Sequence, residues 1–131
     1  MIQANELRVG NYVASDHFKD RDVIVKVRLI GQEQAIVEHP NGLTEPMLYQ
    51  CEMRAIKLTE EILLNCGFED VSTYKDFRLV INEDLYIEVS LRKNINAYVS
   101  IFDIDILNVI YLHQLQNLYF ALTGKELEVK I

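Results

Sequence analysis

Tryptophan is absent from the 131 residues, and proline, cysteine and glycine are scarce, with 2, 2 and 5 copies. So little glycine and proline, beside 50% hydrophobic residues, excludes collagen-like, low-complexity and disordered chains. No apolar run approaches the roughly 20 residues of a membrane-spanning helix, and no secretory signal is visible at the N-terminus. The sequence is therefore typical of a globular protein, and a cytoplasmic location is the default expectation.

The two cysteines indicate neither a cross-link nor a metal centre. Cys51 and Cys66 form no CxxC pair, and no histidine stands at zinc-finger spacing. Structural zinc sites and disulfide frameworks need such groupings. We therefore expect two reduced, mostly buried thiols, and no motif in the sequence implies a cofactor.

Positive charge is also in short supply. Thirteen Lys and Arg stand against twenty Asp and Glu, and the net charge of −7 repels phosphate backbones. Residues 1–58 hold seven basic and eight acidic side chains, whereas residues 59–131 hold six and twelve. Nucleic-acid binding is therefore disfavoured. An alternative is that the acidic second half imitates a nucleic-acid backbone and binds a basic partner.

The first part of the chain is typical of short antiparallel strands. Apolar and polar residues alternate, and clusters that contain glycine interrupt the alternation. Four or five strands of this spacing predict a small, strongly bent barrel of the Src-homology-3-like sort. The candidate strands are 9–13, 23–30, 35–38 and 47–54, the last with Met47, Tyr49, Cys51 and Met53 on one face.

Helix signals agree with one another between Leu58 and Phe68. Thr59 is a typical N-cap, and two glutamates follow it in the first turn, where the helix dipole favours negative charge. Gly67 is expected to end the helix in a left-handed conformation, with Phe68 folding back onto Leu63.

The remaining sequence predicts a three-strand meander, a helix and a last strand. Alternation over 77–91 predicts a hairpin, and 97–106, apolar on both faces in part, predicts a buried central strand. From about Tyr111 the spacing becomes helical, Gly124 closes that helix, and 127–131 alternates again. The fold class is therefore α+β, with helices on one face of a sheet.

Two subdomains are expected, a β-rich part over 1–57 and an α+β part over 58–131. No linker composition separates them, because a helix cap follows the last predicted strand directly. We therefore expect one compact unit in which the two parts share a core.

Few residues are placed for catalysis. No phosphate-binding glycine loop, nucleophile elbow, zincin helix or Walker sequence is present. Asp103 and Asp105, two apart on an expected strand, could hold a metal or act as acid and base, with His113 as a third member. The alternative is a solvated strand end. A couple of Cys66 with His113 is disfavoured, because the end of a helix raises the pKa of a thiol.

Two further features have an ordinary and a functional reading. The segment 16–22 combines three carboxylates with a histidine, but it lacks the glycine and glutamate of a calcium loop and predicts a mobile surface loop. Aromatic residues of the second half could stack on nucleic-acid bases, although core packing is the reading that the acidic charge favours. These residues are Phe77, Tyr86, Tyr98, Phe102, Tyr111, Tyr119 and Phe120.

Three segments carry a resemblance to other proteins: 5–13, the LTEE and GF elements of 58–68, and HQLQNLYFALTG at 113–124. They resemble a group of short uncharacterised proteins of Bacteroides-type gut bacteria, their prophages and their mobile elements. The resemblance covers most of the chain. It implies an intracellular bacterial or phage protein, and it supplies no activity and no catalytic residue.

The start of the last helix is the candidate protein interface. Its leucines explain packing on a sheet, but they leave the polar residues His113, Gln114, Gln116 and Asn117 to be explained. Amides give directional hydrogen bonds to a partner without the desolvation cost of a charge. The alternative is that they cap the helix or bridge to neighbouring strands.

Three functions follow from these observations. The first is a non-enzymatic binding or accessory protein that contacts a protein partner or a second copy of itself. The second is a nucleic-acid-linked module, and the third is a small enzyme centred on Asp103, Asp105 and His113. The cations available to the second function are Arg8, Lys19, Arg21, Lys26 and Arg28.

Overall fold

The computed structural model describes residues 2–18, 23–39, 42, 45–91, 97–102, 104–106 and 109–130. The chain divides into two compact units, Met1–Ile56 and Lys57–Ile131, named unit 1 and unit 2 here. Within the described residues, no helix has the length and apolar character needed to cross a membrane.

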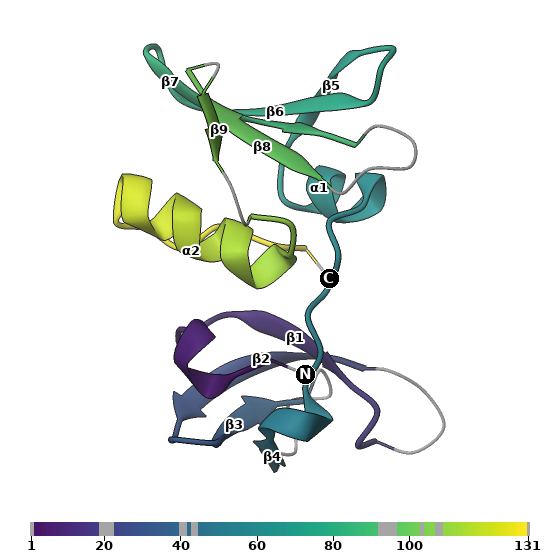
Figure 1. The fold of residues 1–131 in the computed structure, drawn as a ribbon, viewed down its shortest axis with the longest axis vertical. Helices are drawn as coiled ribbons and strands as arrows, with labels where there is room; N and C mark the ends of the chain where they lie inside the picture. The colour runs from purple at the N-terminus through teal and green to yellow at the C-terminus, as the bar shows by residue number, and fades with distance from the viewer. Residues whose placement is uncertain are drawn as a thin grey trace. The chain divides into compact units, whose positions relative to one another are not determined.

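Unit 1 is a curled antiparallel sheet with two short 3-10 helices. Its elements are η1 Ala4–Glu6, β1 Tyr12–Ser15, β2 Val23–Ile30, β3 Gln34–Glu38, β4 Met47–Tyr49 and η2 Gln50–Glu52. The strands pair in the order β1-β2-β3-β4. After η2, the chain returns to β1, where the backbones of Arg54 and Ala14 exchange hydrogen bonds of 2.8 and 2.9 Å. This return curls the sheet into half a barrel (Figure 1).

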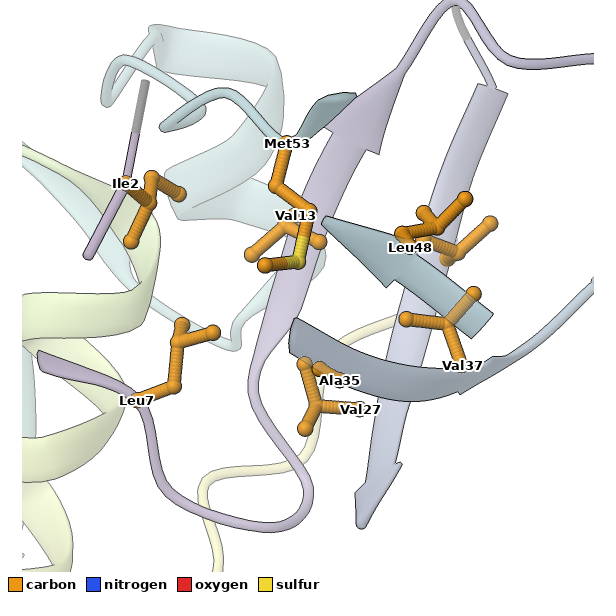
Figure 2. Close-up of a cluster of buried hydrophobic side chains, with 9 residues drawn as sticks. Ile2, Leu7, Val13, Val27, Ala35, Val37, Leu48 and Met53 are labelled. Atoms are coloured by element: carbon orange, nitrogen blue, oxygen red, sulfur yellow. The ribbon is translucent and has the colours of Figure 1, made fainter. Parts of the chain in front are cut away.

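The inner face of that sheet forms the core of unit 1. Side chains from all four strands and from both ends of the unit meet there, and Figure 2 shows them as sticks. Burying an aliphatic side chain of this size stabilises a fold by roughly 1.5–3 kcal/mol. The cluster consists of Ile2, Leu7, Val13, Val25, Val27, Ala35, Val37, Leu48 and Met53.

A bulge in β2 changes which residues face the core. Val27 lies opposite Val37, but Leu29 lies opposite Ile36, so Arg28 is an extra residue in β2. The strand predicted over 23–30 is confirmed in its bounds, and the bulge reverses its alternation at the end. Leu29 therefore lies on the outer face with 60% of its surface exposed.

Two other strand predictions in unit 1 were wrong in part. The strand predicted over 9–13 is displaced to β1, because a turn occupies 9–10. The strand predicted over 47–54 ends at Tyr49, where η2 begins. Leu48 is buried, and Met47 and Tyr49 are exposed. Met53, predicted on the same face as these two, is buried instead, because η2 interrupts the alternation before it.

Unit 2 is a five-stranded antiparallel meander with two helices on one side of the sheet (Figure 1). Phe77, Ile87, Val89 and Val99 alternate inward on three neighbouring strands and are 1% exposed or less. The expected α+β class with helices on one face is therefore observed in this unit. Its elements are α1 Glu60–Asn65, β5 Glu69–Ser72, β6 Asp76–Asn82, β7 Leu85–Ser90, β8 Tyr98–Ile101, β9 Ile104–Ile106 and α2 Leu112–Thr123.

Helix α1 begins and ends where its sequence signals predict. The Thr59 hydroxyl oxygen accepts the backbone N–H of Ile62 at 3.3 Å. Gly67 has a φ of 90°, a left-handed value that costs a residue with a Cβ atom free energy. The Phe68 N–H then reaches the Leu63 carbonyl at 3.0 Å, which confirms the predicted fold-back.

Three predictions for unit 2 were wrong in detail. The polar strand β5, Glu69–Ser72, was missed because it shows no apolar alternation. The segment 97–106 is a hairpin of β8 and β9, with Phe102 at a φ of 53° in the turn, and not one central strand. Residues 125–130 form no strand, although the Lys130 N–H bonds to the Asn65 carbonyl at 2.9 Å. Ile131 lies outside the described residues.

Candidate functional site

The amide side chain at the start of α2 makes hydrogen bonds within the chain. Gln114 Oε1 accepts the backbone N–H groups of Ile110 at 2.9 Å and Tyr111 at 3.1 Å. These donors precede the helix and have no partner within it. The same segment is paired with the residues before α1, because Tyr111 bridges Lys57 and the Leu58 N–H reaches the Ile110 carbonyl. Gln114 thus caps the start of α2, and the backbone at 110–111 joins it to the start of α1.

The other polar residues of the predicted interface are mostly inaccessible. His113 and Gln116 are each 1% exposed, and Asn117 is half-buried. The His113 ring lies nearly parallel to the Tyr111 ring, with centroids 6.1 Å apart. His113 and Gln116 therefore offer a partner almost no surface, and the geometry favours the alternative in which the amides serve the fold.

The predicted acid and metal site is not assembled in the described residues. Asp105 is exposed in the middle of β9, and His113 is buried in α2. Asp103 lies outside the described residues. The strand assumed to carry both carboxylates turns at Phe102, so the spacing on which the pairing depended does not apply. Within the described ranges, no three His, Cys, Asp or Glu side chains gather as metal ligands would.

The two cysteines differ in reactivity. Cys66 caps the end of α1 and is buried, and burial raises its pKa to about 12. A thiol of that acidity holds a negligible thiolate fraction near neutral pH, and the thiolate is the nucleophile. Cys51, in η2, is exposed, which contradicts the expectation that both thiols are buried.

The loop after β1 is attached to η2 by a histidine. His17 Nδ1 lies 2.5 Å from Glu52 Oε2, and the other oxygen of Glu52 accepts the Tyr49 N–H at 3.1 Å. The Tyr49 N–H, followed by His17, lowers the pKa of Glu52. Phe18 packs edge-on against the His17 ring, with centroids 5.3 Å apart. The rest of the predicted loop, 19–22, lies outside the described residues.

Two of the cations proposed for nucleic-acid binding, Arg28 and Lys26, are engaged by neighbouring groups. Arg28 donates to Glu38 at 2.9 Å and lies 3.7 Å from Glu45, and the Glu38 hydrogen bond raises the pKa of Arg28. The Lys26 ammonium stands 5.9 Å from the centroid of the Tyr12 ring. Of the other cations in that hypothesis, Lys19 and Arg21 lie outside the described residues.

The aromatic residues of unit 2 have different surroundings. Phe77 is in the core, and Tyr86 lies beneath the Arg78 guanidinium, whose carbon is 4.3 Å from the ring centroid. Arg78 also donates to Glu88 at 3.0 Å. The exposed aromatics come from separate elements: Tyr74 in the turn before β6, Tyr98 on β8, Phe102 in the following turn and Phe120 on α2.

An apolar group on unit 1 is a candidate binding site. Leu29, Ile36 and Met47 lie opposite one another on β2, β3 and β4, and Tyr49 follows Met47 on the same face of β4. Leu29, Met47 and Tyr49 are 60%, 47% and 52% exposed. We name these four residues the outer apolar face. Sequence reasoning missed this face because regular alternation over 23–30 places Leu29 on the same side as Val25 and Val27. No glycine marks the bulge at Arg28 that turns Leu29 outward.

Comparison with protein-family models, curated proteins and solved structures finds no match to this chain. The functional argument therefore depends on the chain's own residues.

Proposed function

We propose that this chain is a non-enzymatic binding protein that contacts another protein through the outer apolar face. The observation that carries the proposal is the row formed by Leu29, Ile36 and Met47 across three paired strands, extended by Tyr49. A fold that needed these residues only for stability would turn them toward the core, as it does with Val27 and Leu48. The bulge in β2 instead holds Leu29 outward.

The residue types suit a protein contact. Tyrosine and methionine are enriched in protein interfaces, where few residues supply most of the binding energy. Because about half of each side chain is exposed, covering Leu29, Met47 and Tyr49 contributes roughly 1–2 kcal/mol each.

Unit 1 supplies the scaffold that holds the outer apolar face. We propose that it is a Src-homology-3-like barrel, on the basis of four antiparallel strands, the 3-10 helix η2, and the return of Arg54 to Ala14 on β1. Such barrels hold side chains of neighbouring strands in fixed register. From the sequence resemblance alone, we further propose that the protein is encoded by a Bacteroides-type bacterium or by its prophage, and that it acts in the bacterial cytoplasm.

The alternative of a nucleic-acid module has less support. Binding to phosphates requires cations that can exchange counterions for the backbone. Arg28 already has two carboxylate neighbours, and the chain carries a net charge of −7. A protein surface with apolar groups matches the outer apolar face better than a phosphate backbone does.

The test is affinity capture of tagged chain from lysate of its source organism at low and high salt. Leu29→Ser combined with Met47→Ser is compared with Leu64→Ser, a control on α1 with a similarly exposed leucine at 50%. We expect the double variant to lose a stoichiometric protein that the control retains. Equal retention by both variants, or salt-sensitive nucleic acid as the bound species, would contradict the proposal.

A further inference from the structure

We propose that Glu52 closes the outer edge of β4, so that the backbone of this strand does not pair with a strand of another chain. The inference concerns the edge of the sheet, and it does not depend on what binds the outer apolar face. Three observations support it: the direction of the backbone groups in β4, the position of the Glu52 carboxylate on one of them, and the contact of His17 with that carboxylate.

The backbone of β4 directs hydrogen-bonding groups away from the sheet. β4 is the last strand in the order of unit 1, and among the described residues no strand pairs with its outer edge (Figure 1). Along an antiparallel pair, residues that bond to the neighbouring strand alternate with residues whose groups point away from it. Pro46 and Gln50, which flank β4, both make backbone hydrogen bonds on the β3 side. The backbone groups of Met47 and Tyr49 therefore point to the outer edge.

An edge of this kind is a place where other chains add. The N–H and C=O groups of an edge strand can pair with a strand of another molecule, and exposed apolar side chains beside them make that pairing more favourable. Met47 and Tyr49 are 47% and 52% exposed. Folded proteins limit such pairing with short edge strands and with charged side chains. β4 has three residues, and a charged side chain lies on its edge.

That charged side chain is Glu52, and it occupies the edge at Tyr49. Its Oε1 atom accepts the Tyr49 N–H at 3.1 Å, from η2, the 3-10 helix that directly follows β4. An added strand would have to bring a carbonyl oxygen to the same N–H. It would exchange a charge-assisted hydrogen bond for a neutral one, which is weaker. Glu52 therefore closes one of the two outward-facing positions of β4.

His17 fixes the carboxylate from its other side. The Nδ1 atom of His17 lies 2.5 Å from Glu52 Oε2. The backbone N–H of His17 in turn donates to the hydroxyl of Ser15 at 3.1 Å, and Ser15 is buried at the end of β1. The Tyr49 N–H, followed by His17, lowers the pKa of Glu52 and so favours its charged form. The carboxylate is thus attached to β1 as well as to η2.

Hydrogen exchange of backbone amides, followed by NMR on the full chain, tests the contact at the edge. Glu52→Ala should speed exchange of the Tyr49 N–H roughly tenfold, because a charge-assisted hydrogen bond is lost. The Val37 N–H, which bonds to the Pro46 carbonyl on the inner side of the pair, should keep its rate. An unchanged rate at Tyr49 would overturn the inference. Equal acceleration at Val37 would also overturn it, because Glu52 would then stabilise the whole unit and not the edge.

Two further variants separate the acceptor from a general effect of removing a carboxylate. Glu52→Gln keeps an oxygen that can accept the Tyr49 N–H, so it should exchange more slowly at Tyr49 than Glu52→Ala does. Glu6→Ala is the matched control, because Glu6 accepts the Gln3 N–H at 3.0 Å in η1 with the same three-residue spacing. It should leave exchange at Tyr49 unchanged. Acceleration at Tyr49 by Glu6→Ala equal to that by Glu52→Ala would contradict the assignment of Glu52.

Sedimentation velocity across a concentration series tests the consequence for pairing. We expect Glu52→Ala to self-associate at a roughly tenfold lower concentration than the unsubstituted chain. Adding Tyr49→Pro should abolish this gain, because proline has no N–H for an added strand, and the φ of −81° at Tyr49 accommodates it. Adding Tyr49→Ala instead removes the ring, keeps the N–H and should retain the gain. No gain in Glu52→Ala, or its loss with Tyr49→Ala as well as with Tyr49→Pro, would overturn the inference.

Discussion

Substituting Gln114 separates a capping role from an interface role at the start of α2. Its Oε1 atom accepts two backbone N–H groups, from Ile110 and Tyr111. Gln114→Ala removes both hydrogen bonds, each worth about 0.5–1.5 kcal/mol net. Alanine recovers a few tenths of a kcal/mol through its higher helix propensity. We therefore expect the free energy of unfolding to fall by about 0.7–2.7 kcal/mol.

Gln114→Glu is the matched control for this experiment. Glutamate keeps an acceptor oxygen at the same position and adds a negative charge in the first turn of α2, where the helix dipole favours it by about 0.3–1 kcal/mol. The variant should be as stable as the unsubstituted chain or slightly more stable. A partner surface built around a neutral amide would instead be disturbed by the charge without any change in the stability of the isolated chain.

Urea denaturation followed by far-UV circular dichroism measures these differences, because the chain contains no tryptophan for fluorescence. The capping argument is refuted if Gln114→Ala leaves the free energy of unfolding unchanged within about 0.3 kcal/mol. It is also refuted if Gln114→Glu destabilises the chain as much as alanine does.

Three further predictions follow from the described residues. Ellman's reagent should modify one thiol, Cys51, in the native chain and a second, Cys66, only in denaturant. The reason is that Cys66 is buried and burial raises its pKa to about 12. Rapid modification of two thiols in the native chain would contradict this prediction. Gly67→Ala should lower the free energy of unfolding by about 1 kcal/mol, because φ is 90° there; an unchanged midpoint would show that the left-handed cap is not needed. Glu52→Gln should destabilise the chain at pH 7, because the Tyr49 N–H and His17 lower the pKa of this carboxyl. The carboxylate's contribution is present above the unfolded pKa of about 4.3 and is lost as pH falls through the lower folded pKa. The denaturation midpoints of variant and parent should therefore converge below that folded pKa, and a constant difference would exclude the carboxylate as the cause.

The sequence predicted elements whose signals are local. The Thr59 cap and the Gly67 end of α1 depend on residues within one or two helical turns, and both are observed. The strand over 23–30 has enough alternation to fix its bounds. These features need no knowledge of the rest of the fold.

The errors arose where backbone geometry departs from regular alternation. The bulge at Arg28 turns Leu29 outward, and a left-handed Phe102 divides one predicted strand into two. Neither position carries the glycine or asparagine that usually marks such geometry. The short η2 likewise separates Met53 from Met47, with which regular alternation would place it on one face.

The candidate site was hard to predict because it depends on tertiary burial. The amides of α2 attracted a functional interpretation as polar residues in an apolar helix, but Gln116 is buried and Gln114 bonds to the chain. The outer apolar face received no functional interpretation, because leucine and methionine are residue types that usually lie in a core, whereas Leu29 and Met47 are exposed. Only the register of three strands shows that they share an exposed face.

Site-specific photo-crosslinking at Leu29 in cells of the source organism tests the central claim most directly. A benzophenone amino acid replaces Leu29 in one strain and Leu64, on α1, in another, since both positions are exposed. The account predicts one discrete crosslinked protein species from position 29 and none of that mass from position 64. The absence of a discrete species at position 29, or the same species from both positions, would contradict the assignment of the outer apolar face as the binding site.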